Sequence, residues 1–126
     1  MSSAHNGTPS TTTITLQGWA GRQFTGTVTS NSNTGTFTFT YRDGDTCVYI
    51  GEYSNGMFNG KGLLKWSDGG SYECEWRDSM KHGVGVDTFP SGGRQLNEYE
   101  HDRRTRIISE GVCCTLLFNA DVINKN

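Results

Sequence analysis

Residues 49–66 alternate along the chain in a way that predicts a β-hairpin. Over residues 49–54, aromatic residues and glycine alternate with isoleucine, glutamate and serine, the period of two expected of a strand with one buried face. Residues 54–56, Ser-Asn-Gly, supply turn chemistry because glycine adopts positive φ without steric cost. Residues 60–66 then return with two glycines, a leucine and a tryptophan on one face.

The hairpin pattern recurs with a period of 23 residues. Residues 49–71 and 72–94 align without a gap, aromatic on aromatic and glycine on glycine. An earlier copy, residues 24–48, is two residues longer, and a fourth copy begins at Gln95 and loses its likeness near Arg104. Because one hairpin is marginal in water, we expect the copies to stack, with atypical copies at the ends.

The spaced glycines predict how the hairpins pack. An aromatic ring can lie flat across a neighbouring strand only where the crossed residue lacks a side chain. The order of aromatic, glycine, aromatic and then a Gly-x-Gly pair therefore acts as a packing code. Each hairpin presents rings to its neighbour's glycines.

Composition and charge narrow the class of protein. The chain has 126 residues, 17 of them glycine and only 2 proline, which makes a helical bundle implausible. No apolar run approaches the roughly 18 residues of a membrane-spanning helix. The net charge is −2, so we expect no nucleic-acid partner.

The N-terminal residues 1–23 differ from the rest. Arg22 is the one Lys, Arg, Asp or Glu residue before Tyr41, and the segment is rich in serine, threonine and asparagine. It is expected to be a flexible polar arm in which residues 11–17 can form a strand that caps the array. The first residues lack the basic start and apolar core of a signal peptide, so a cytoplasmic location is expected.

On these residues the chain resembles the MORN (membrane occupation and recognition nexus) repeat family. The 49–71 copy carries Tyr-x-Gly-x-Tyr, a turn glycine, Gly-x-Gly and Asp-Gly, and the 72–94 copy follows it closely. The resemblance implies an all-β fold, a single-layer antiparallel β-hairpin repeat array. It would have three firm repeats of 23–25 residues, at 24–48, 49–71 and 72–94, and residues 95–126 would hold a degenerate fourth repeat and a C-terminal cap or dimerisation segment.

The family resemblance also suggests a function. It implies a non-catalytic scaffold or adaptor that binds a partner protein or peptide along an aromatic groove, with an association to the cytoskeleton or to membranes. Tryptophan and tyrosine are frequent interface anchors. The expected groove residues are Tyr49, Tyr53, Trp66, Tyr72, Trp76, Phe89 and Tyr99.

The alternative function is a membrane-associated module that binds anionic phospholipid headgroups. Each Lys or Arg near an anionic surface contributes about 1 kcal/mol. The residues expected to contact lipid are Lys61, Lys65, Arg103, Arg104 and Arg106. Against this reading, Glu52, Glu75 and Glu98 recur every 23 residues as an acidic stripe. The stripe is either a solvated outer face or a patch for a basic partner, and in both cases it is a poor surface for anionic lipid.

Candidate catalytic and metal-binding groups are sparse. Cys47, Cys74, Cys113 and Cys114 include no Cys-x-x-Cys pair and are expected to be free structural thiols. His82 occupies a repeat position held by asparagine or threonine in other copies, which favours a turn or packing role. We therefore expect no catalytic residue, no metal and no cofactor.

The C-terminal part is expected to mediate assembly. Residues 112–118 form a mostly apolar run that must pack somewhere, and residues 107–120 can be read as strand or as helix. The segment can fold back as a cap or pair with a second chain. Since the family resemblance favours dimers, a homodimer through residues 95–120 is predicted.

Overall fold

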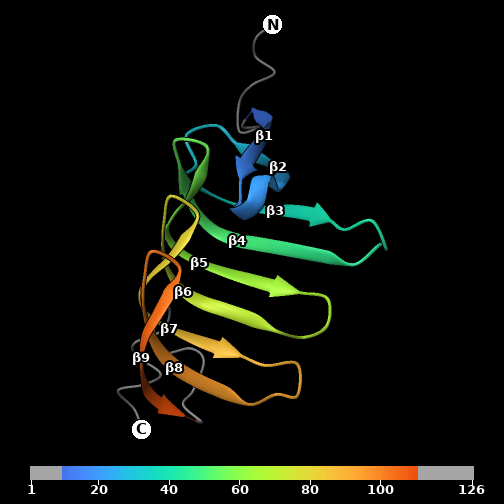
Figure 1. Ribbon diagram of the computed structural model, residues 1–126. Coiled ribbons are helices and arrows are strands. Elements are labelled where there is room, and N and C mark those ends of the chain that lie inside the picture. Colours follow the sequence, from blue (N-terminus) through green and yellow to red (C-terminus); the bar gives the residue numbers. More distant parts are fainter. Residues whose placement is uncertain (1–9, 111–126) are drawn as a thin grey trace, which may run out of the picture.

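The computed structural model describes residues 10–110, which form one nine-stranded sheet whose strands follow chain order (Figure 1). The single-layer, all-β array of antiparallel hairpins predicted from the repeats is confirmed. A single turn of 3₁₀ helix, Trp19–Gly21, follows the first strand. The strands are β1 Thr11–Gln17, β2 Gln23–Thr29, β3 Thr34–Thr40, β4 Thr46–Ser54, β5 Met57–Trp66, β6 Ser71–Arg77, β7 Met80–Thr88, β8 Arg94–Glu100 and β9 Arg103–Glu110.

Each sequence copy corresponds to one hairpin. The copies pair as β2–β3, β4–β5, β6–β7 and β8–β9. The fourth copy forms a complete hairpin although its likeness to the others fades near Arg104, and its pairing continues to Glu110. His101 and Asp102 make its turn with φ values of 51° and 68°, a left-handed conformation that these residue types tolerate better than most.

The hairpin turns show one departure from expectation. Asn31 and Gly56 adopt φ values of 68° and 74°, as their residue types allow. Ser79, expected to be a poor substitute at this position, adopts φ 64° and is buried. Its hydroxyl accepts a hydrogen bond from the Phe58 N–H (3.0 Å) and donates to the Gln17 carbonyl oxygen. These tertiary contacts offset the backbone strain.

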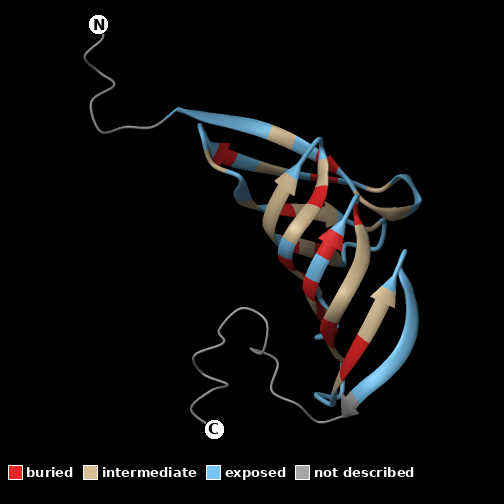
Figure 2. Cartoon of the chain, turned by 90° about the vertical axis from the view of Figure 1, so that its left-hand side faces the viewer, coloured by how far each residue is buried: buried red, intermediate tan, exposed pale blue. Residues whose placement is uncertain are grey.

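The core lies along one face of the sheet and consists of rings packed over glycines, as the packing code predicts. A Cβ placed on Gly62 would lie 2.3 Å from the Tyr49 ring, and one on Gly85 would lie 2.5 Å from the Tyr72 hydroxyl oxygen. Tyr49 stacks on Phe58 with centroids 3.9 Å apart and planes 7° apart. Figure 2 shows the buried positions running as a band along the strands, with exposed positions between them.

The first strand forms the N-terminal edge of the sheet. β1 pairs with β2 without interruption from Thr11 to Gln17. Its last residue also reaches the second repeat, because Gln17 N–H donates to the Gly56 carbonyl at 2.7 Å and Gln17 pairs in parallel with Met57. The expected arm before residue 10, and the Cys113–Cys114 pair within the apolar run after residue 110, lie outside the described residues.

Candidate functional site

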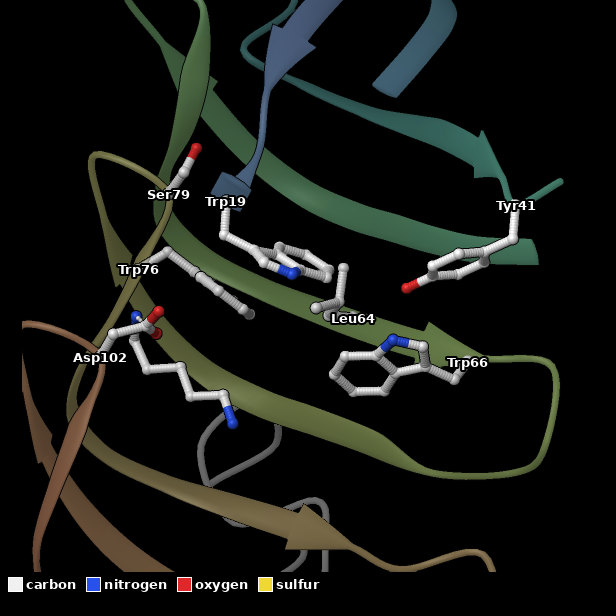
Figure 3. A pocket seen from close by; sticks show the side chains of 8 residues that line it. Trp19, Tyr41, Leu64, Trp66, Trp76, Ser79 and Asp102 are labelled. Atoms are coloured by element: carbon white, nitrogen blue, oxygen red, sulfur yellow. Dashed lines mark hydrogen bonds between the residues drawn. The ribbon is translucent and has the colours of Figure 1, made fainter. Parts of the chain in front are cut away.

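A hollow of about 330 Å³ opens on the same face as the buried rings (Figure 3). Four aromatic side chains surround it, and we call them the aromatic groove: Trp19, Tyr41, Trp66 and Trp76. Leu64 forms part of its floor, and Ser79, Lys81 and Asp102 complete the lining. These residues come from five separate stretches of the chain, so the hollow forms only when the hairpins stack.

The expected groove set lacks two of these four rings, Tyr41 and Trp19. Trp19 lies in the 3₁₀ turn after β1, with its ring centroid 5.7 Å from that of Phe24 and 6.2 Å from that of Trp66. Gly18 permits this approach, since a Cβ there would lie 2.7 Å from the Phe24 ring. A tryptophan in an otherwise polar segment was the available signal, but the segment belongs to no repeat.

Tyr41 and Trp66 occupy equivalent repeat positions at strand ends. Both project onto the groove face, as Figure 3 shows, and both remain half-buried. Phe89 occupies the equivalent position in the third repeat. It is 44% exposed and shares a second hollow of about 290 Å³ with Trp66. Trp66 therefore joins two neighbouring hollows and is the central ring of this surface.

Part of the predicted groove set is corrected by the structure. Tyr49 and Tyr72 are 0% exposed, because each ring is covered by its neighbours and by a glycine-bearing strand. Trp76 is 4% exposed and donates its indole N–H to the Gly62 carbonyl, so it forms the wall of the groove mainly from within the core. These three residues support the groove from within the core and offer little or no accessible surface to a partner.

Tyr53 and Tyr99 are half-buried and already hydrogen-bonded. The Tyr53 hydroxyl donates to the Ser32 carbonyl at 3.1 Å, and its ring packs edge-on against Phe37. The Tyr99 hydroxyl donates to Asp87. Among the seven predicted groove residues, Trp66 and Phe89 are thus those that the structure brings to an accessible hollow, with Trp76 behind them.

A polar cluster lies beside the aromatic groove at Lys81. The Lys81 ammonium nitrogen is 4.5 Å from the Tyr72 ring centroid, 4.8 Å from that of Tyr99 and 3.6 Å from Asp87 Oδ1. Asp87 Oδ2 also accepts from the Asn97 amide at 2.6 Å. Burial, with the hydrogen bond to Asp87, raises the pKa of Tyr99, so its hydroxyl stays protonated and donates.

Arg22 lies at the other end of the groove, against rings. Its guanidinium carbon is 5.4 Å from the Trp19 and Tyr41 ring centroids and 5.6 Å from that of Phe39. Such contacts contribute about 0.5–2 kcal/mol each, depending on desolvation. Arg22 therefore fixes the rings of Trp19 and Tyr41 relative to each other.

Three exposed carboxylates border the Trp66 end, and we call them the acidic rim: Asp43, Asp45 and Asp68. They line a third hollow, also about 290 Å³, together with Tyr41 and Trp66. Asp43 and Asp68 each accept a backbone N–H two residues on, at 2.9 Å and 2.8 Å, which fixes their turns. Aromatic surface and negative charge thus adjoin at one end of the groove.

The acidic stripe predicted from the repeat is in part a structural device. Glu52 Oε1 accepts the Lys61 N–H at 2.7 Å, and the side chain lies over Gly60, whose φ is 103°. Glu98 binds Arg106 at 2.7 Å between Oε1 and Nε. Glu75 remains exposed on β6. The repeated glutamate therefore serves hairpin geometry at its first occurrence and an ion pair at its last.

The basic residues predicted to contact lipid do not gather into one cluster. Lys61 and Lys65 are exposed on the face of β5 opposite the groove residues Leu64 and Trp66. Arg103, Arg104 and Arg106 lie on β9, four strand spacings or about 19 Å away. No helix within residues 10–110 is long and apolar enough to cross a bilayer.

The two described cysteines are inert by environment. Cys47 and Cys74 are free and buried. Burial raises the pKa of the Cys47 thiol to about 12 and that of Cys74 to about 11, the opposite of what a nucleophilic thiol requires. Within the described part of the chain, no group of three or more His, Cys, Asp or Glu side chains is placed to hold a metal ion.

Comparison with known proteins addresses the repeats directly. Residues 49–71 and 72–94 each match the sequence profile described as the MORN repeat. The chain is also similar to the ALS2 C-terminal-like protein of Mus musculus, with 32% identity over 76 residues. That region is 57% of this chain and 8% of the relative, so the chain spans less than a tenth of the length of the curated relative it matches.

Proposed function

We propose that this protein is a non-catalytic scaffold or adaptor that binds a partner protein, because residues 49–94 are two adjacent MORN repeats. The MORN repeat is a module associated with membrane or protein interactions. The observation that carries the proposal is the aromatic groove, a hollow of about 330 Å³ with three tryptophans and a tyrosine in its lining. Half-buried aromatic rings around a concave surface are the usual anchors of protein and peptide interfaces.

The charges around the groove support a partner segment of particular chemistry. Lys81 is already held by Asp87 and two rings, and Arg22 is packed against aromatic neighbours. The acidic rim is exposed to solvent. A partner segment with an apolar residue that enters the aromatic groove at Trp66, and with Lys or Arg beside that residue, would match both the aromatic rings and the acidic rim.

Binding of peptides from a displayed random library tests this proposal. Trp66→Ala removes the central anchor, and Asp45→Lys reverses one rim charge at a position with no side-chain hydrogen bond to lose. We expect selected peptides to carry Lys or Arg beside an apolar residue. We expect their Kd to rise about tenfold or more for each variant, since an interface anchor contributes roughly 1–2 kcal/mol or more.

Two matched controls keep the test specific. Ile50→Ala trims a 42%-exposed side chain on the opposite face, and Glu100→Lys makes the same charge change on β8, away from the rim. Both should bind as the wild type does. A library that yields no binder, or binders retained by Trp66→Ala and Asp45→Lys, would reject the groove.

Sedimentation with phosphatidylserine vesicles at physiological salt separates the lipid alternative from the proposal. The proposal expects little binding, because the basic side chains are divided between β5 and β9. Strong binding that is lost in a Lys61→Glu/Lys65→Glu variant, with no peptide binding in the groove, would favour a headgroup-binding module instead.

A further inference from the structure

Within residues 10–110, the edge of β1 that faces away from β2 carries a regular row of backbone groups without a hydrogen-bond partner. Hydrogen bonds from Ser30 N–H to the Ser10 carbonyl (2.8 Å) and from Gly18 N–H to the Arg22 carbonyl (2.7 Å) lie at the two ends of the β1–β2 ladder. In an antiparallel pair, residues alternate between those that bond across and those that face away. The even-numbered residues of β1 therefore bond to β2, and Thr11, Thr13 and Thr15 present their N–H and C=O groups outward.

Gln17 fixes this assignment independently. It is the next odd-numbered residue, and its N–H reaches away from β2 to the Gly56 carbonyl at 2.7 Å. The outward row is thus satisfied at Gln17 and open at the three threonines before it. Their side chains are exposed as well, and Figure 2 shows this strand at the end of the sheet.

The two edges of the described sheet differ in protection. β1 has no charged residue and no proline, and its pairing with β2 has no register shift over seven residues. At the other edge, β9 carries Arg103, Arg104 and Arg106, and its pairing with β8 is interrupted by two register shifts. Charges and bulges are the devices that keep edge strands from pairing, and β1 has neither.

We propose that β1 is a pairing edge for a second copy of this chain. Two β1 strands join in antiparallel fashion about a two-fold axis at Thr13. Thr11 then lies opposite Thr15 of the second copy, and Thr13 lies opposite its own equivalent. All three outward residues exchange backbone hydrogen bonds, and the contact closes at two because both copies use the same edge.

A second copy fits this edge better than it fits the other. The three outward threonines are self-complementary, uncharged and small, so that two copies meet without like-charge contacts. The equivalent two-fold pairing of β9 would bring its arginines near those of the second copy, where like charges oppose association. The proposal concerns the strand edge alone and does not require the aromatic groove to be occupied.

Thr13→Pro is the sharpest variant for a test. Proline removes an N–H that bonds no other group among residues 10–110, and an edge strand tolerates proline at such a position. Analytical ultracentrifugation of the full chain should show dimer at micromolar to millimolar concentration for the wild type, and monomer for Thr13→Pro. Thr13→Lys, which places two ammonium groups opposite each other, should also be monomeric.

Thr27→Lys is the matched control. Thr27 pairs directly with Thr13 and shares its exposed face, but its backbone groups that point away from β1 face β3 rather than the free edge. This variant should still dimerise if the copies pair through the β1 edge. If they associated instead through the exposed threonine side chains of β1 and β2, Thr27→Lys would abolish the dimer. A second readout is amide exchange, in which Thr11, Thr13 and Thr15 should gain protection with concentration while Thr12 and Ile14 are protected throughout.

Three results would overturn the proposal. The first is a wild-type chain that stays monomeric at 13.9 kDa across the whole concentration range. The second is a Thr13→Pro dimer as stable as that of the wild type. The third is a dimer that survives Thr13→Lys and is lost in Arg104→Glu or after deletion of residues 111–126, which would assign the contact to the predicted segment 95–120.

Discussion

At the scale of single residues, glycine is a packing residue in this protein. Gly62→Ala would place a methyl group 2.3 Å from the Tyr49 ring, and Gly85→Ala would place one 2.1 Å from the Cys74 Cβ. Rings and strands must shift to accept either methyl group. We expect each variant to lower the free energy of unfolding by about 1–3 kcal/mol, measured by urea denaturation.

Gly93→Ala is the control for this prediction. Gly93 has no positive φ, and its nearest contact for a new Cβ is 3.8 Å away. This variant should be neutral or slightly stabilising, because alanine restricts the unfolded chain. Equal loss of stability at Gly62 and Gly93 would contradict the packing role.

The thiols give a second prediction at this scale. In a Cys113→Ser/Cys114→Ser background, Cys47 and Cys74 should not react with a disulfide reagent at pH 8 until urea unfolds the chain. Their folded pKa values, about 12 and about 11, lie above the ordinary 9.0. Unfolded thiols lose protons near pH 9 while folded ones keep them, so the free energy of unfolding should fall as pH rises from 9 toward 11. Rapid labelling of the folded protein at pH 8 would contradict this environment.

At the scale of elements, the β6–β7 turn depends on a side chain from within it. Ser79→Ala removes the acceptor of the Phe58 N–H and the donor to the Gln17 carbonyl and keeps the strained φ of 64°. Leaving such groups unpaired costs about 1–3 kcal/mol. Ser79→Gly loses the same bonds but relieves the backbone, so its Tm should fall less than that of Ser79→Ala. Asn31→Gly, at an exposed turn with φ 68°, should leave Tm nearly unchanged.

The elements were largely predictable, and the reason is local. A period of two, turn residues and a 23-residue repeat specify the three firm hairpins from neighbouring residues. The return strand of the fourth copy, β9, was not predicted, because residues 95–110 lack the glycines of the repeat. Ser79 and Trp19 could not be placed, because their roles depend on contacts with Gln17 and Trp66, far away in sequence. Rings over glycines were predicted, but Tyr49 and Tyr72 were also expected to line the groove, and they are fully covered instead. Such complete burial depends on what neighbouring repeats cover.

At the scale of the whole molecule, the two ends of the array are anchored differently. At the N-terminal end, Gln17 bonds to Gly56 and Ser79, which ties β1 to the second and third repeats. At the C-terminal end, the β8–β9 hairpin contacts one neighbouring hairpin within the described sheet, through β7. Repeat arrays are stabilised mainly by nearest-neighbour contacts, so this difference should appear in local stability.

Native-state hydrogen exchange should therefore resolve the array into units. Amides of β8 and β9 should exchange through openings of lower free energy than those of β4–β7, because their hairpin has one described interface to lose and the inner hairpins have two. Amides of β1 that bond to β2 should exchange with opening free energies like those of the inner strands, because the bonds of Gln17 to Gly56 and Ser79 anchor that end. Leu16→Ala truncates a 0%-exposed side chain next to Gln17. It should weaken this anchoring and lower the protection of β1 and β2 much more than that of β6 and β7. A single opening free energy shared by all nine strands would show instead that the sheet unfolds as one cooperative unit, and the end-dependent stability argued from the contacts would be wrong.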